Sequence, residues 1–114
     1  KDLVKSHENN QEVNKLLEQT AVKYCLQLLH KKAPGNSVEV RIPPYAAVQV
    51  IPGISHKRGT PPAVIEMSAR IWIDLAIGKI DWITTKNSGA FSASGERADL
   101  STLLPLISAQ DLAN

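Results

Sequence analysis

The sequence predicts an α+β domain built around a mixed or antiparallel sheet. Apolar residues recur every three or four positions over 13–32, which indicates an amphipathic helix. Short alternating or apolar runs follow at 38–42, 46–51 and 63–67, and such runs are typical of strands. A pair of helical patterns, one more strand and a last helical pattern complete the chain. A run of strands flanked by helices favours the α+β class.

The length and composition of the chain limit the kinds of protein it can be. Its 114 residues suffice for one domain, which we place at 13–114, and the polar residues 1–12 are expected to be a flexible or helical lead-in. A net charge of +2 and few aromatic residues give no indication of a nucleic-acid partner. No apolar run is long enough for a membrane span, and no signal-like segment is seen. With a single cysteine, Cys25, no internal disulfide can form, and we expect a cytoplasmic protein.

The first helix is expected to bury a continuous apolar stripe. Its members are Val13, Leu16, Leu17, Ala21, Tyr24, Cys25, Leu28 and Leu29. Ala33-Pro34-Gly35 should end this helix, because proline disfavours a helical residue before it and glycine permits a left-handed turn. The strands 38–42 and 46–51 are separated only by a short Pro43-Pro44 connection. They are therefore expected to pair antiparallel.

The helix expected at 69–77 has too much apolar surface for one stripe. Ser68 is a suitable N-cap and Gly78 a suitable C′ residue. The apolar positions between them are Ile71, Trp72, Ile73, Leu75, Ala76 and Ile77. A surface helix normally has one polar face. This helix must therefore be covered on two sides, either by a protein partner or by an apolar ligand.

The last third of the chain is expected to hold a short helix, a strand and a closing helix. Asp81 can cap the short helix, and the strand is expected at 90–94. Gly89 and Gly95 stand at the two edges of this strand, where positive φ or close chain approach is expected.

The closing helix has two candidate caps, Asp99 and Ser101. Pro105 favours a start at Ser101 or a kink, because proline deeper in a helix removes a hydrogen bond.

The sequence offers no catalytic or metal-binding pattern. His7, His30 and His56 lack metal-ligand spacing with any other His, Cys or carboxylate. Phosphate-binding glycine loops, dinucleotide fingerprints and a Gly-x-Ser-x-Gly elbow are missing. Cys25 lies among apolar helical residues, so we interpret it as a core thiol, and an enzyme using Cys25 or His56 is the weakest hypothesis. We therefore predict no stand-alone catalysis, no cofactor and no metal site.

The loop 54–62 contains the best polar candidates. Arg58 could hold an acidic head group or phosphate, since its guanidinium is a rigid fork of donors, and His56 lies beside it. The alternative is a solvated loop between strands.

Several motifs together resemble the sterol carrier protein type two family. Gly78-Lys79-Ile80-Asp81, then Ser88-Gly89, then Gly95 have the spacing of a family motif in which a turn follows a helix and a glycine pair brackets a strand. Beyond this motif, the sequence is similar to the bacterial branch of this family. The matching pieces are Ala33-Pro34-Gly35, Val38-Glu39-Val40-Arg41, Pro44-Tyr45-Ala46-Ala47-Val48-Gln49, Arg58-Gly59-Thr60-Pro61-Pro62, Trp72, Trp82, Ser94-Gly95, Arg97-Ala98-Asp99-Leu100 and Leu104-Pro105-Leu106.

The resemblance implies a fold and a function. The fold would be a four- or five-stranded, mainly antiparallel sheet covered by helices, with an apolar cavity between them. Relatives use this cavity for a sterol, a fatty acid or acyl-CoA, and the stand-alone domain has no catalytic residues. The lining that we expect here is Val48, Ile65, Trp72, Leu75, Ala76, Trp82, Phe91, Leu103 and Leu106, with His56 and Arg58 as head-group candidates.

Two functions are compatible with these observations. The first is a non-catalytic lipid-binding or carrier module. The second is a structural or protein-interaction domain, including an accessory domain or subunit of a larger enzyme. A cavity and an interface require the same apolar side chains, so the sequence leaves both functions, and the oligomeric state, open.

Overall fold

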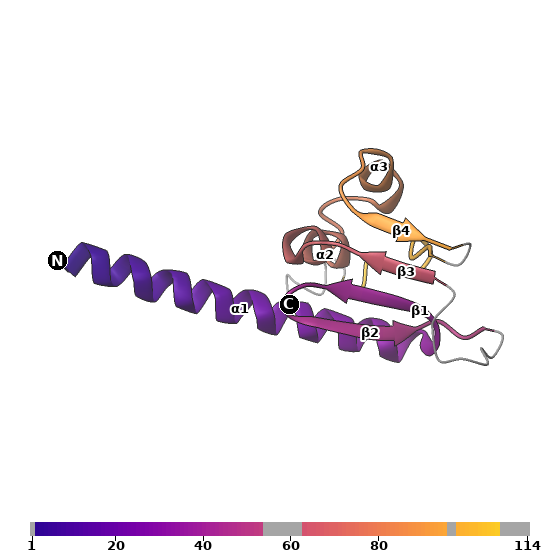
Figure 1. The fold of residues 1–114 in the computed structure, drawn as a ribbon, viewed down its shortest axis with the longest axis horizontal. Helices are drawn as coiled ribbons and strands as arrows, with labels where there is room; N and C mark the ends of the chain where they lie inside the picture. Colours follow the sequence, from indigo (N-terminus) through magenta and orange to yellow (C-terminus); the bar gives the residue numbers. More distant parts are fainter. Residues whose placement is uncertain (1, 54–62, 96–97, 108–114) are drawn as a thin grey trace.

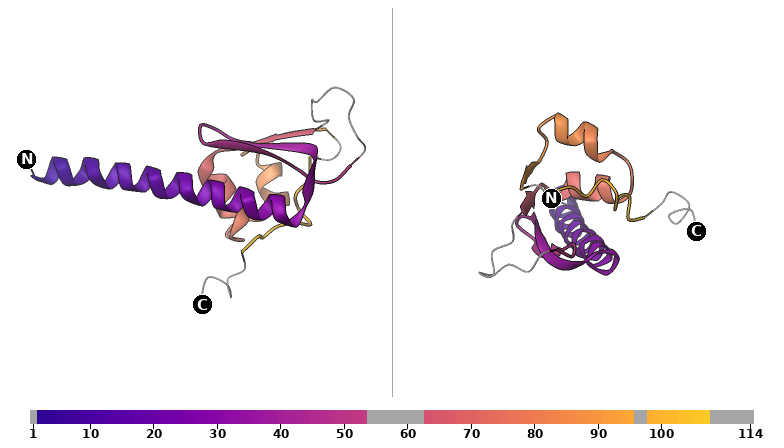
Figure 2. Two further views of the ribbon diagram at one scale, coloured as in Figure 1. Left: turned by 90° about the horizontal axis from the view of Figure 1, so that it is seen from below. Right: turned by 90° about the vertical axis from the view of Figure 1, so that its right-hand side faces the viewer.

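The protein is a mixed four-stranded sheet with a long helix and two short helices (Figure 1). This computed structural model describes 2–53, 63–95 and 98–107, with side chains described from Asn14 onward. Figure 2 shows the first two helices, α1 and α2, on one side of the sheet. The predicted α+β class is confirmed.

The sheet combines antiparallel and parallel pairs. Its strands are β1 (Pro34–Ile42), β2 (Ala46–Val50), β3 (Ala63–Glu66) and β4 (Ser92–Ser94), in the spatial order β2-β1-β3-β4. β1 pairs antiparallel with β2, as predicted, and β3 pairs antiparallel with β4. The central pair, β1 with β3, is parallel.

The long helix α1 (Asp2–Lys32) extends well beyond the sheet (Figure 1). It buries Val22, Cys25, Leu26 and Leu29 in the core. The predicted stripe was wrong in three members, because Leu16, Leu17 and Tyr24 are 63%, 61% and 54% exposed. The buried side chains lie on the later turns of the helix, and its earlier turns extend beyond the strands (Figure 1).

The core lies between α1, the sheet and α2 (Ala69–Ala76). Trp72 is fully buried, and its indole Nε1 donates a hydrogen bond to the Val22 carbonyl oxygen at 3.2 Å. This bond joins two elements fifty residues apart and satisfies the one polar atom of the largest core side chain. Ser68 is the N-cap of α2, and its Oγ accepts from Ile71 N at 3.3 Å. The helix predicted from the apolar run is thus confirmed.

The short helix α3 (Trp82–Asn87) also begins at its predicted cap. Asp81 Oδ2 accepts a hydrogen bond from Thr84 N at 2.9 Å. Gly89 and Gly95 have φ values of 79° and 98°, so the prediction of positive φ at both glycines is confirmed.

The predicted closing helix is wrong. Residues 98–107 form turns and bends instead of a helix. Asp99 Oδ1 accepts from Ser101 N at 2.9 Å, but the turn does not propagate. Pro105 has no N–H to donate, and its ring obstructs a preceding helical turn. The chain instead packs on the end of α2, where Leu106 N and Ile107 N both donate to the Ala76 carbonyl oxygen at 2.7 and 3.0 Å.

Candidate functional site

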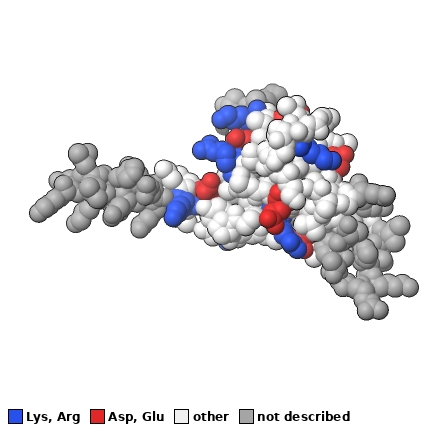
Figure 3. All heavy atoms as spheres, turned by 45° about the horizontal axis from the view of Figure 1, so that its top comes forward, with Lys and Arg blue, Asp and Glu red and all other residues white. Residues whose placement is uncertain are grey.

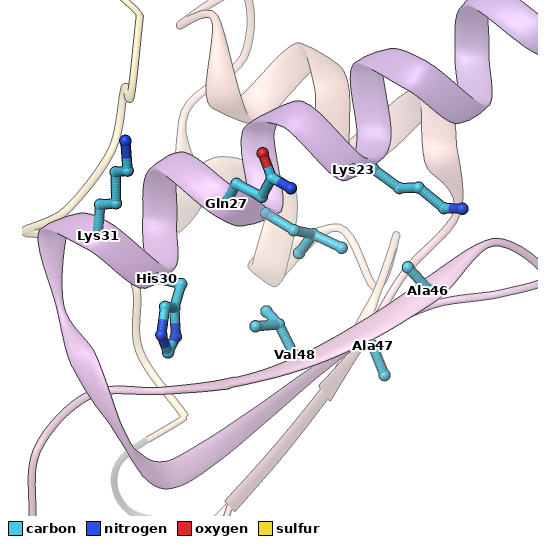
Figure 4. A pocket seen from close by; sticks show the side chains of 8 residues that line it. Lys23, Gln27, His30, Lys31, Ala46, Ala47 and Val48 are labelled. Atoms are coloured by element: carbon cyan, nitrogen blue, oxygen red, sulfur yellow. The ribbon is translucent and has the colours of Figure 1, made fainter.

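The candidate site is a predominantly apolar hollow between α1 and the edge strand β2 (Figure 4). Its volume is about 410 Å³, which falls in the range of small-molecule sites. The residues that line it are Lys23, Leu26, Gln27, His30, Lys31, Ala46, Ala47 and Val48.

The periodicities of the two elements build this hollow. Side chains alternate along a strand, so Ala46 and Val48 point toward α1 while Ala47 points away (Figure 4). On the helix, Lys23 and His30 are seven residues apart and therefore lie on one face, about two turns apart. Leu26, buried against the core, supplies apolar surface between them. The hollow consequently has an apolar floor and a polar rim.

The rim of the hollow is positive. It carries Lys23, His30 and Lys31, and no carboxylate is among the described residues that line it. Lys23 has no hydrogen-bond or ion-pair partner in the described part of the chain, where Lys32 by contrast donates to the Leu103 carbonyl oxygen at 2.9 Å. His30 Nδ1 lies 3.3 Å from the Gln49 carbonyl oxygen, which holds the imidazole over β2 at the end of the hollow.

A smaller hollow of about 260 Å³ lies between α2, α3 and the segment 98–107. Its lining comprises Leu75, Gly78, Ile80, Asp81, Trp82, Ile83, Ser101, Leu104 and Pro105. The Trp82 ring also meets Phe91 in a tilted arrangement, with 4.6 Å between the centroids. This hollow is smaller and less apolar than the first, and the described residues that line it include no basic side chain.

The structure distributes the predicted lining over several places. Val48 lines the larger hollow, while Leu75 and Trp82 line the smaller one. The side chains of Ile65, Trp72 and Ala76 are fully buried core. Those that pack half-buried against the core are Phe91, Leu103 and Leu106. The head-group candidates His56 and Arg58 lie outside the described residues.

Sequence reasoning missed the α1 side of the larger hollow. Lys23 and Gln27 lie outside the apolar stripe predicted for the first helix, and His30 was assessed only for metal-ligand spacing. The spacing of Lys23, Gln27 and His30 by four and three residues was a usable signal, because it places them on one helical face. What the pattern does not contain is the position of β2 beneath that face.

The charged side chains on one face and the Cys25 thiol bear on other kinds of chemistry. On the face shown in Figure 3, basic and acidic side chains are interspersed over the described residues. Cys25 is 3% exposed, and burial raises the pKa of its thiol, which keeps it protonated and unreactive. Among the residues that the structure describes, no group of three potential metal ligands comes together, and no helix is long and apolar enough to cross a bilayer.

Comparison with protein-family models identifies a family for the chain. A protein-family model described as bacterial SCP ortholog matches residues 14–106. The matched range contains both hollows and every strand of the sheet. No curated protein matches the chain.

Proposed function

We propose, since the chain belongs to the bacterial SCP ortholog family, that it is a non-catalytic module that binds and carries a lipid. The ligand is an apolar small molecule: a sterol, a fatty acid or the acyl chain of acyl-CoA. The observation that carries this proposal is the hollow between α1 and β2, whose apolar floor is formed by Leu26, Ala46 and Val48. These three side chains are hydrocarbons, so they offer a surface for one acyl chain and have no nucleophilic or acid–base group.

The energetics allow such a function. Burying one methylene group contributes about 0.8 kcal/mol, so ten of them contribute about 8 kcal/mol. Association costs at least about 4 kcal/mol in lost translational and rotational freedom. The remainder is at most about 4 kcal/mol, which corresponds to a Kd of about 1 mM or weaker. Such weak affinity is compatible with a carrier, because a carrier must also release its cargo.

The test is ligand binding by protein that has been stripped of lipid. We expect saturable binding of a fluorescent fatty acid to the wild type. Val48→Phe should weaken that binding severalfold, because the larger side chain fills the hollow from the β2 side. Gln49→Phe is the matched control, since Gln49 alternates to the opposite face of β2 and does not line the hollow. Wild-type protein that binds neither an acyl chain nor a sterol, up to the solubility of each, would contradict the proposal.

A second candidate function is a protein-interaction module. The observation in its favour is the exposed apolar surface of α1, formed by Leu16, Leu17 and Tyr24. Native mass spectrometry of the purified protein separates the two functions, because it reports stoichiometry and bound lipid together. A lipid-free oligomer that dissociates in the double variant Leu16→Glu, Leu17→Glu would favour the interaction module over the carrier.

A further inference from the structure

We infer that the hollow between α1 and β2 selects single-chain amphiphiles with a small anionic head group over neutral ones, and that Lys23 holds the head. This inference rests on the proposed function and names the class of ligand for the same site. The class includes carboxylates such as fatty acids and excludes uncharged alcohols, sterols among them, as preferred ligands.

The first argument is the charge of the rim. Lys23, His30 and Lys31 border the hollow, and the described lining has no acidic residue. The nearest preceding carboxylate on α1, Glu18, is not among the residues that line the hollow, and it accepts a hydrogen bond from the Tyr45 hydroxyl at 2.8 Å. The one ion pair among the described residues joins Arg41 and Glu39 elsewhere on the sheet. The described lining therefore carries the positive charges of Lys23 and Lys31 and no negative charge.

The second argument is the placement of Lys23. In Figure 4 its side chain extends along the edge of the hollow toward Ala46, whereas Lys31 points away from β2. His30 occupies the opposite end, about two helical turns or roughly 10 Å along α1. A head group beside Lys23 leaves the acyl chain free to follow Leu26 and Val48 toward His30.

The third argument is the cost of the wrong ligand. An apolar chain lying in the hollow removes water from the rim, and a partly desolvated ammonium without a partner is unfavourable. A carboxylate compensates the Lys23 ammonium with a charge-assisted hydrogen bond, while an alcohol compensates it poorly. Because Lys23 is exposed, the advantage is modest, and we expect about a three- to fivefold preference.

The experiment compares two probes with identical tails, dodecanoate and dodecan-1-ol, by calorimetric titration of the lipid-stripped protein in buffer of low ionic strength. The wild type should bind dodecanoate about three- to fivefold more tightly. Lys23→Gln should make the two affinities equal by weakening dodecanoate alone. Lys15→Gln, which makes the same charge change on the same helix outside the hollow, should preserve the preference. Added salt should reduce it.

The outcomes separate the inference from the proposed function. Equal wild-type affinities for the two probes would overturn the inference and leave the carrier function standing. A preference that survives in Lys23→Gln would overturn the assignment of Lys23. Absence of binding by both probes would overturn the inference, and the proposed function would fail with it only if a sterol also did not bind. Loss of dodecanoate binding in Val48→Phe supports the inference by placing the probe in this hollow.

Discussion

Gly35 is a residue at which the backbone geometry does not tolerate a side chain. It is the second residue of β1 and has a φ of 154°, and a Cβ at this position would overlap the carbonyl group of Ile51. The two backbone segments are held together there, because Ser37 N and Ser37 Oγ both donate to the Ile51 carbonyl oxygen, at 3.2 and 2.7 Å. Close approach of two backbones is therefore the reason for glycine.

Gly35→Ala should lower the free energy of unfolding by about 2 kcal/mol or more, since the clash involves backbone that cannot move aside. Gly89→Ala is the comparison, because φ is 79° there but no atom lies within 4 Å of the added Cβ. It should cost only about 1 kcal/mol, from the strained backbone alone. Urea denaturation measures both, and equal losses would refute the role of the Ile51 contact.

The residue scale also shows what sequence can and cannot specify. The positive φ of Gly89 and Gly95 was predictable, because turn geometry depends on neighbouring residues. The close approach of Gly35 to Ile51 was not, since the two residues are brought together only by pairing of β1 with β2.

At the scale of elements, α3 provides a pH-dependent prediction through its cap. Hydrogen bonds from the Thr84 amide and hydroxyl groups lower the pKa of Asp81 below its usual value of about 3.9. A lowered folded-state pKa means that the stabilisation is present above the unfolded-state pKa. It is lost as the pH falls through the folded-state value.

Asp81→Ala should therefore lower the urea midpoint at neutral pH, and the difference from wild type should shrink below about pH 4. Asp81→Asn is the control, because asparagine also caps helices but does not titrate. A deficit in Asp81→Ala that stays constant down to about pH 2 would show that the charge of the cap plays no part.

Elements with local signals were predictable, and those that depend on distant contacts were not. α2 and α3 were expected with their caps Ser68 and Asp81, because capping is encoded within a few residues. The closing helix failed at Pro105, where the end of α2 offers the Ala76 carbonyl oxygen as an alternative partner. A competing acceptor from another element leaves no trace in the local pattern.

At the scale of the whole molecule, α1 is supported along only part of its length. Val22, Leu26 and Leu29 are buried, whereas Leu16 and Leu17 are more than half exposed. Isolated helical turns are marginally stable in water, so the earlier turns should open more often than the later ones.

Hydrogen exchange followed by mass spectrometry should show this gradient. Backbone amides in 14–18 should exchange faster than those in 22–29, by orders of magnitude in protection factor, because only the later turns pack on the core. Uniform protection along α1 in dilute protein would mean that another surface covers Leu16 and Leu17. That result would strengthen the interaction module described above.

The candidate site itself was only partly within reach of the sequence. Val48 was predicted as lining and does line the larger hollow, yet its companions Lys23 and His30 come from the opposite element. The rotation of α1 about its axis decides which residues face β2, and that rotation depends on packing against Trp72 and the sheet. Apolar pattern alone placed Tyr24 inside, where the structure has it exposed.

The parallel pairing of β1 with β3 bears on how quickly the chain reaches its native state. β1 and β2 are neighbours in sequence, so their hairpin closes a short loop. β3 and β4 are separated in the sequence by α2 and α3. In the central pair Val38 lies opposite Ala63, and the whole β1–β2 hairpin lies between these two residues in the sequence. Non-local contacts of this kind raise the contact order, and folding slows because the entropy of loop closure is lost before the contacts form. Pairing of β1 with β3 is therefore the expected rate-limiting event. Substitutions in β3 should slow refolding more than substitutions in β2.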